Sequence, residues 1–231
     1  MSNFKYYRPN NFPPITKNLI IINVLVYIAQ SVLDNQYHLT EKLMLYPVQD
    51  RNFAPYQIAT HMFAHAPFPT VYHILFNMFA LWMFGRILEN IWGPRRFLLF
   101  YIVCGVGAAA THLAMQYFRW EEVQHLLNAG NVEAAQRAYA GLGPALGASG
   151  AIMGIFAAFA YLFPNTELYI LFIPIPIKAK WAVLGMAAID LFGGLYNMNG
   201  DNVAHFAHLG GAITGIILVL IWNKTNRKKF Y

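Results

Sequence analysis

Charged residues are scarce in this chain. Only 11% of its 231 residues are Asp, Glu, Lys or Arg and 58% are apolar, whereas an average soluble domain carries about 25% charged residues. Charges are absent from five long stretches, which are residues 18–33, 52–85, 97–118, 138–166 and 202–223. Several of these stretches match or exceed the roughly 20 apolar residues that cross a bilayer as a helix. The composition excludes a soluble globular domain and indicates a polytopic membrane protein.

Cysteine and serine are also rare. Cys104 is the single cysteine, so an intramolecular disulfide is excluded. The serines are Ser2, Ser31 and Ser149, and only Ser149 lies among glycines. No HExxH motif or Cys/His cluster occurs, although His61 and His65 have the i, i+4 spacing of a weak metal site. We therefore expect no cofactor and no metal.

The apolar stretches predict an all-α fold, a compact bundle of six transmembrane helices. The predicted spans are 16–33, 71–88, 96–118, 148–163, 176–192 and 203–222. We expect a tail at 1–15, a six-helix membrane domain at 16–223 with an extended outer loop at 119–146, and a basic tail at 224–231. Within that outer loop, 120–129 and 132–140 read as two short helices, because a glycine follows each.

Lysine and arginine are divided unequally between the two sides of this bundle. With the N-terminus inside, the inner segments hold 12 and the outer loops four, which is the direction that the positive-inside rule requires. We therefore expect a multi-pass protein of the plasma (inner) membrane with both termini cytoplasmic. Cations spread over inner loops do not form the basic face of a nucleic-acid site. The inner set is Lys5, Arg8, Lys17, Arg86, Arg95, Arg96, Lys178, Lys180, Lys224, Arg227, Lys228 and Lys229, and the outer set is Lys42, Arg51, Arg119 and Arg137.

A serine and a histidine inside the spans form a candidate catalytic pair, because polar residues at membrane depth are costly. Ser149 opens a span of only about 16 residues, roughly 24 Å long, so its outer end lies below the surface of a core about 30 Å thick. His208 lies at a similar depth in the sixth span, beside glycines that suit close packing against Gly150 and Gly154. The pair supplies a nucleophile and a base, and His205 is a competing base one turn nearer water.

Two further residues are candidates for binding a developing negative charge. His73 and Asn77 are four residues apart on one face of the second span, and their side chains can donate hydrogen bonds to an oxyanion. The plain alternative is polar contact between helices. Asp190 is left open between orienting His208 and joining two helices, and Cys104 with His112 reads as core.

These residues resemble the rhomboid intramembrane serine proteases. The resemblance rests on Gly147-Ala148-Ser149-Gly150, on Ala207-His208-Leu209-Gly210-Gly211 with Gly215, and on His73 and Asn77 followed by Glu89. Thr60-His61, His65 and Asp190-Leu191-Phe192 are also similar, and order and spacing agree from Thr16 to Trp222. The family's tryptophan–arginine pair in the first outer loop is replaced by Tyr56-Gln57, which predicts a different anchoring of that loop.

The resemblance implies a Ser–His dyad without an obligatory third acid. It makes Ser149 the nucleophile and His208 the general base, and it places His73, Asn77 and the Ser149 backbone N–H in an oxyanion hole. The implied partners are the lipid bilayer and single-pass transmembrane protein substrates, cleaved near the outer membrane face, with no nucleic acid.

Two other functions are open from the sequence. A non-catalytic rhomboid-like protein that binds membrane clients is one, although such relatives typically lack the serine or the histidine. A metal or proton conductor lined by histidines is the other, although the inner half of the membrane domain offers only His112.

Overall fold

Helices form most of the described structure. The computed structural model describes residues 9–169, 175–196 and 204–225. The helices are α1 (Pro14–Tyr37), α2 (Leu39–Leu43), α3 (Gln57–Thr60), α4 (Val71–Ala80), the π-helical turn η1 (Leu81–Gly85), α5 (Arg86–Trp92), α6 (Pro94–Asn128), α7 (Val132–Tyr139), α8 (Ser149–Leu162), α9 (Ala179–Tyr196) and α10 (His205–Thr225). This confirms a polytopic helical fold.

A small pair of strands accompanies the helices. Strands β1 (Glu167–Tyr169) and β2 (Pro176–Lys178) form a small antiparallel pair between α8 and α9. Helix α8 ends at Leu162, because Pro164 disfavours helical geometry at Phe163, and the strands then pair Glu167 with Lys178. Strand β2 takes the first three residues of the fifth predicted span, 176–192, and the helix of that span, α9, begins only at Ala179.

Each predicted span overlaps a helix or, for 71–88, the continuous run of α4, η1 and α5. Four helical segments are long and apolar enough to cross a bilayer, namely 14–37, 71–92, 94–128 and 205–224. Of the other two, α8 has 14 residues and α9 has 18, so a count of six crossings stays a prediction. The predicted start of the sixth span at Val203 and the cations Lys5, Arg8, Arg227, Lys228 and Lys229 lie outside the described residues, as do most of the two predicted tails.

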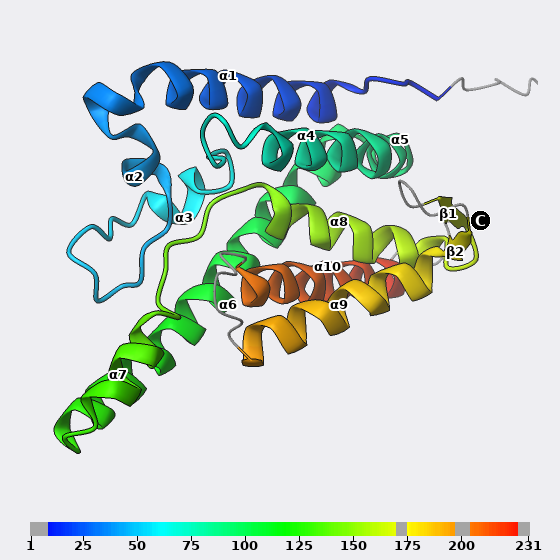
Figure 1. The fold of residues 1–231 in the computed structure, drawn as a ribbon. Coiled ribbons are helices and arrows are strands. Elements are labelled where there is room, and N and C mark those ends of the chain that lie inside the picture. The colour runs from blue at the N-terminus through cyan, green and yellow to red at the C-terminus, as the bar shows by residue number, and fades with distance from the viewer. Residues whose placement is uncertain (1–8, 170–174, 197–203, 226–231) are drawn as a thin grey trace, which may run out of the picture.

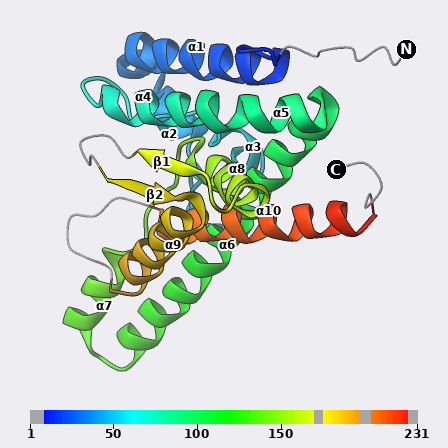
Figure 2. The same cartoon turned by 90° about the vertical axis from the view of Figure 1, so that its right-hand side faces the viewer.

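The predicted outer loop at 119–146 is largely helical. Helix α6 does not end at Phe118 but continues for 35 residues to Asn128, because residues 119–128 contain no glycine or proline and several good helix formers. Gly130, whose φ of 74° lies in the left-handed region, then reverses the chain. Asn131 caps α7 by accepting a hydrogen bond from the Ala134 N–H at 3.2 Å. Figures 1 and 2 show this helical hairpin projecting from the bundle.

Helix α8 lies in the middle of the bundle, where it packs against both α6 and α10 (Figure 1). All residues from Gly150 to Ala160 are buried. The contact with α10 is made by backbone, because a Cβ on Gly211 or Gly215 would overlap the carbonyl groups of Gly150 or Gly154. Small residues of this kind allow two helices to approach closely in a membrane.

One buried carboxylate attaches α1 to the rest of the bundle. Glu89 is 2% exposed. It accepts hydrogen bonds from the backbone N–H groups of Ile15 and Thr16, at 2.8 and 2.7 Å, and from the Thr16 hydroxyl at 2.8 Å. Helix α1 has no side-chain cap of its own, so Glu89 satisfies N–H groups at the end of the helix that otherwise lack partners.

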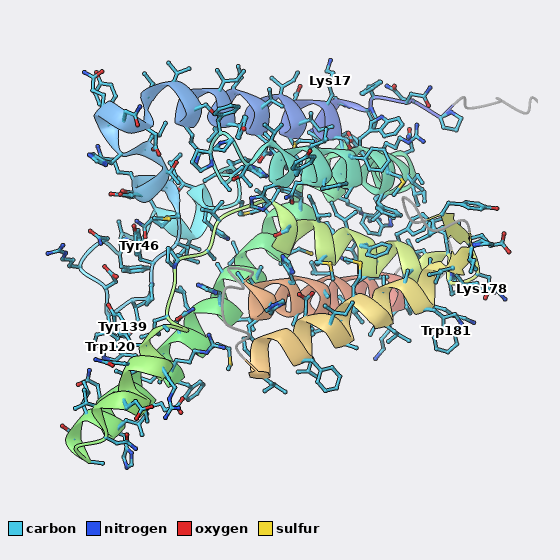
Figure 3. All side chains as sticks on the ribbon, in the orientation of Figure 1. Lys17, Tyr46, Trp120, Tyr139, Lys178 and Trp181 are labelled. Carbon is cyan, nitrogen blue, oxygen red and sulfur yellow. The ribbon has the colours of Figure 1, made fainter. Side chains whose placement is uncertain are left out.

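The two ends of the bundle differ in character. Helix α1 begins and α10 ends at the same end, as Figure 2 shows. Figure 3 shows Tyr46, Trp120 and Tyr139 at one end of the molecule and Lys178 and Trp181 at the other. The division of cations between inner segments and outer loops stays a prediction.

The glycine contact between α8 and α10 predicts a sharp difference between two alanine substitutions. Gly211→Ala places a methyl group against the Gly150 carbonyl, whereas a Cβ on Gly185 meets nothing within 4 Å. We expect Gly211→Ala to lower the free energy of unfolding by about 2 kcal/mol or more, and Gly185→Ala to leave it unchanged or slightly raised. Thermal unfolding in detergent measures both, and equal stability of the two variants would contradict the packing described.

Candidate active site

Ser149 is the first residue of α8 and is half-buried. The chain reaches it through Gly147, whose φ of 122° is rarely adopted by residues with a side chain. The Gly147 N–H donates to the carbonyl oxygen of His61 at 2.9 Å. The hydroxyl therefore sits beside the free N–H groups of a helix N-terminus, where the helix dipole favours negative charge.

His208 lies within hydrogen-bond distance of Ser149. Its Nε2 is 2.8 Å from the Ser149 Oγ, and the two residues come from the two helices whose glycines touch. The proximity predicted from the sequence is therefore present. The chemical role of each side chain stays a prediction.

Asp190 of α9 contacts the other side of the same imidazole. Its Oδ1 is 3.0 Å from His208 Nδ1 and 2.8 Å from His205 Nδ1. The sequence left His205 as a competing base and Asp190 without a decided role. In the structure His208 faces the serine, and His205 shares the carboxylate.

His73 presents a hydrogen-bond donor to the serine side of the site. The Ala66 N–H donates to His73 Nδ1 at 3.2 Å. A neutral His73 therefore carries its proton on Nε2. That Nε2 lies 3.0 Å from the position of a Cβ on Gly147, and the Ser149 Oγ lies 3.6 Å from the same position. Glycine at 147 leaves this space open.

Asn77 is buried one turn along α4 from His73. One of its amide hydrogens is used within the helix, because Nδ2 donates to the His73 carbonyl oxygen at 2.7 Å. An amide nitrogen carries two hydrogens, so the second can serve another acceptor. His73, Asn77, Ser149 and His208 all line one cavity of about 940 Å³.

The cavity extends toward a cation that the sequence analysis assigned only to an outer loop. Arg119 lines it and donates to the carbonyl oxygens of Gly141 and Gly194, at 2.6 and 2.8 Å. It thereby joins α6, the segment before α8 and the end of α9. One sequence signal could have pointed to Arg119 as a cavity residue. It lies seven residues after His112, and in a continuous helix that spacing puts Arg119 and His112 on one face.

The first outer loop is anchored by glutamines. Gln57 is 1% exposed; its Oε1 accepts from the Ala54 N–H at 3.2 Å and its Nε2 donates to the Asn52 carbonyl oxygen at 2.9 Å. Gln30 of α1 exchanges two hydrogen bonds with the His65 backbone, at 2.9 and 3.0 Å. Gln57, where the family pattern has arginine, therefore takes part in fixing the loop.

The remaining candidates are structural in this arrangement. His61 Nδ1 lies 2.9 Å from the Gln57 carbonyl oxygen, and the ring centroid of His65 is 5.1 Å from that of His73. Within the described ranges no group of three or more His, Cys, Asp or Glu residues could hold a metal ion. Cys104 is buried against Gly154, which agrees with a core role.

The fold and this cavity define a polytopic helical membrane protein with a serine–histidine pair at the end of a buried helix. The family model described as the rhomboid domain matches residues 52–224. The chain belongs to the rhomboid family.

Three relatives illustrate the match. Rhomboid protein 1, mitochondrial, of Saccharomyces cerevisiae is 29% identical over 221 residues, which cover 91% of this chain and 57% of that protein. Presenilin-associated rhomboid-like protein, mitochondrial, of Homo sapiens is 30% identical over 210 residues, covering 88% and 48%. RHOMBOID-like protein 12, mitochondrial, of Arabidopsis thaliana is 25% identical over 221 residues, covering 94% and 60%. The chain spans about half the length of these relatives.

The names of these relatives correct one prediction. Each is called a mitochondrial protein, so the predicted location in the plasma (inner) membrane with cytoplasmic termini is wrong. The division of lysine and arginine reports the orientation of helices in a membrane. It carries no information about which membrane of a cell that is.

Burial of His65 beside the site predicts a pH-dependent stability. Desolvation, with a smaller effect from His73, lowers the pKa of His65 from 6.5 to about 4. The unfolded chain therefore binds a proton at a higher pH than the folded one, and stability contributed by neutral His65 is lost as the pH falls from 6.5 toward 4. We expect His65→Gln to reduce the loss of stability over this range by about 1–3 kcal/mol.

Unfolding of the wild type and of His65→Gln, followed in detergent between pH 4 and 7, measures this difference. The other histidines titrate in both proteins, so their contribution is common to the two curves. Parallel curves would show that His65 is not buried in its neutral form.

Proposed function

We propose that this chain is a serine endopeptidase that cleaves transmembrane protein substrates within the membrane, near its outer face. Membership of the rhomboid family supports a function of the intramembrane-protease kind. The observation that carries the finer proposal is the 2.8 Å contact between His208 Nε2 and Ser149 Oγ on the wall of a large cavity.

The proposed reaction begins with a proton transfer. His208 Nε2 takes the proton of the Ser149 hydroxyl while Oγ attacks the carbonyl carbon of the scissile peptide bond. The imidazolium then gives the proton to the leaving nitrogen, and an acyl-enzyme remains. A water molecule, losing its proton to His208, hydrolyses the ester, and the proton returns to Ser149 Oγ as the acid product leaves.

The negative charge that develops on the carbonyl oxygen needs donors that are already in place. We assign this role to the Ser149 backbone N–H, to Nε2–H of His73 and to the second amide hydrogen of Asn77. These groups come from α8 and α4, which border the cavity from two sides. They hold little freedom to reorganise, because His73 is fixed by Ala66 and Asn77 by its own helix.

The position of the serine supports a substrate that enters from the bilayer. Helix α8 has 14 residues, which span about 21 Å against a hydrocarbon core of about 30 Å. Ser149 then lies below the level of the headgroups. A peptide bond inside a substrate helix is shielded by its own hydrogen bonds, so a suitable substrate must unwind locally, as sequences with glycine or proline do most easily.

Replacing the proposed nucleophile gives the first functional prediction. We expect Ser149→Ala to abolish cleavage of a tagged single-span reporter whose transmembrane helix carries glycine near its outer end, assayed in liposomes. Ser31→Ala is the matched control, because the Ser31 hydroxyl only donates to the Tyr27 carbonyl oxygen of its own helix, at 2.9 Å. Undiminished cleavage by Ser149→Ala would remove the proposal and would favour a client-binding protein.

Removing one of the proposed oxyanion donors gives the second functional prediction. Asn77→Ala should lower the rate of cleavage by a factor on the order of 10²–10³. Asn90→Ala serves as the control, because Asn90 binds the backbone of Asn10 and Arg86 at the opposite end of α4 and α5. A reduction smaller than about tenfold would assign Asn77 to helix packing alone.

A further inference from the structure

Asp190 is a buried carboxylate that the proposed reaction does not yet use. It is 5% exposed and lies on α9, which carries no other acid. Within the part of the chain that the structure describes, no lysine or arginine forms an ion pair with it. Its recorded partners there are the two imidazoles of α10. A carboxylate removed from water needs such partners, because burying an unpaired charge is expensive.

We infer that Asp190 is a positioning residue that orients His208 as the base for Ser149, with His205 holding the carboxylate in place. The inference rests on the proposed function and deepens it. The resemblance to the family alone implies a dyad. Here the contacts form a continuous chain from the Asp190 carboxylate through His208 to the Ser149 hydroxyl.

The chain of contacts selects one tautomer of His208. An ionised carboxylate only accepts hydrogen bonds, so the Nδ1 atom facing Asp190 Oδ1 at 3.0 Å must carry a hydrogen. A neutral His208 then has its lone pair on Nε2, and that nitrogen faces the Ser149 hydroxyl at 2.8 Å. The carboxylate therefore holds His208 in the form that can accept the serine proton.

The same contact stabilises the charge that the reaction creates. When His208 takes the proton of Ser149 it becomes an imidazolium, with a carboxylate 3.0 Å from Nδ1. The attraction between them is much stronger at a buried site than in water. The proton stays on the imidazole until it passes to the leaving nitrogen, so Asp190 itself gains and loses no proton.

His205 completes the arrangement from the first turn of α10. It is three residues before His208, so both rings lie on one face of the helix, and its Nδ1 is 2.8 Å from the same Oδ1 atom. Gly193 of α9 leaves room for it, because a Cβ there would overlap the His205 ring. Two donors converging on one oxygen limit the rotation of the carboxylate.

Four titratable or reactive groups surround His208 in the described structure. They are Ser149 of α8, Asp190 of α9, His205 of its own helix and, across the same cavity, His73 of α4. Of these, Asp190 is the only acid. No other described acid can take over its role toward the imidazolium.

The test compares Asp190→Asn with wild type in steady-state cleavage of the single-span reporter in liposomes. Asparagine keeps the size but removes the charge and the preference for an Nδ1–H tautomer. We expect kcat to fall by a factor on the order of 10²–10⁴, with KM changed by less than about threefold. Ile189→Ala, which alters an exposed neighbour on α9, is the control and should leave kcat unchanged.

A purely structural role for Asp190, joining α9 to α10, gives a different result. In that case Asp190→Asn lowers the melting temperature while kcat of the folded fraction stays within about threefold of wild type, and the inference is overturned. His205→Ala is expected to lower kcat less than Asp190→Asn, because the carboxylate keeps its contact with His208. A larger loss of kcat for His205→Ala than for Asp190→Asn would contradict the role of Asp190 as the residue that orients His208.

A second measurement uses the unaltered protein and stands if Asp190→Asn does not fold. Nitrogen-15 NMR of histidine-labelled wild type, with His208→Ala to assign the signal, reports which ring nitrogen carries the hydrogen. We expect protonated Nδ1, and protonation on Nε2 alone contradicts the inference. Ser149→Ala, assayed in parallel, separates failure of the proposed function from failure of the role of Asp190. Cleavage by Ser149→Ala removes the proposed function. An inactive Ser149→Ala together with a fully active Asp190→Asn removes only the role of Asp190.

Discussion

The contact between the backbones of α8 and α10 is the constraint on which the rest of the structure depends. Gly150 and Gly154 meet Gly211 and Gly215 so closely that no side chain fits between them. Ser149 directly precedes the first of these glycines, and His208 lies one turn before Gly211. Because both side chains project from the end of a contact that cannot slide, their 2.8 Å separation follows from helix packing.

The elements around this contact place polar groups at its outer end. The first outer loop reaches it through the hydrogen bond from Gly147 to His61 and through paired backbone contacts between Leu45 and Ala145. Helix α4 supplies His73 and Asn77, and α9 supplies Asp190. Most of these groups have a hydrogen-bond partner on another element. These hydrogen bonds offset the free-energy cost of burying polar groups inside an apolar bundle.

Much of this could be predicted from the sequence because a membrane restricts the choices. Charge-free stretches reveal helices, and glycine beside Ser149 and His208 reveals which helices touch. The length of α6 could not be deduced in the same way. The sequence predicts a helix at 120–129, but it does not show that this helix continues the third span without a break, because charged residues at 119–122 are as compatible with a loop as with a helix that leaves the bilayer.

The contacts of Arg119 and the shared carboxylate of Asp190 were hidden for a different reason. Each depends on how three elements meet, and spacing along the chain reports only on neighbours within one element. Asp190 is 15 residues from His205 and 18 from His208, and part of the connection lies outside the described residues. The cellular location could not be predicted from these patterns either, because helices pack by the same physics in every membrane.

The central claim is that Ser149 is a nucleophile activated by His208. Its most direct test is to expose the wild-type protein in detergent to a fluorophosphonate probe and to locate the adduct by mass spectrometry. The account predicts a single adduct on Ser149 that is lost in His208→Ala. An adduct formed equally well without His208, or one found only on another residue, would contradict it.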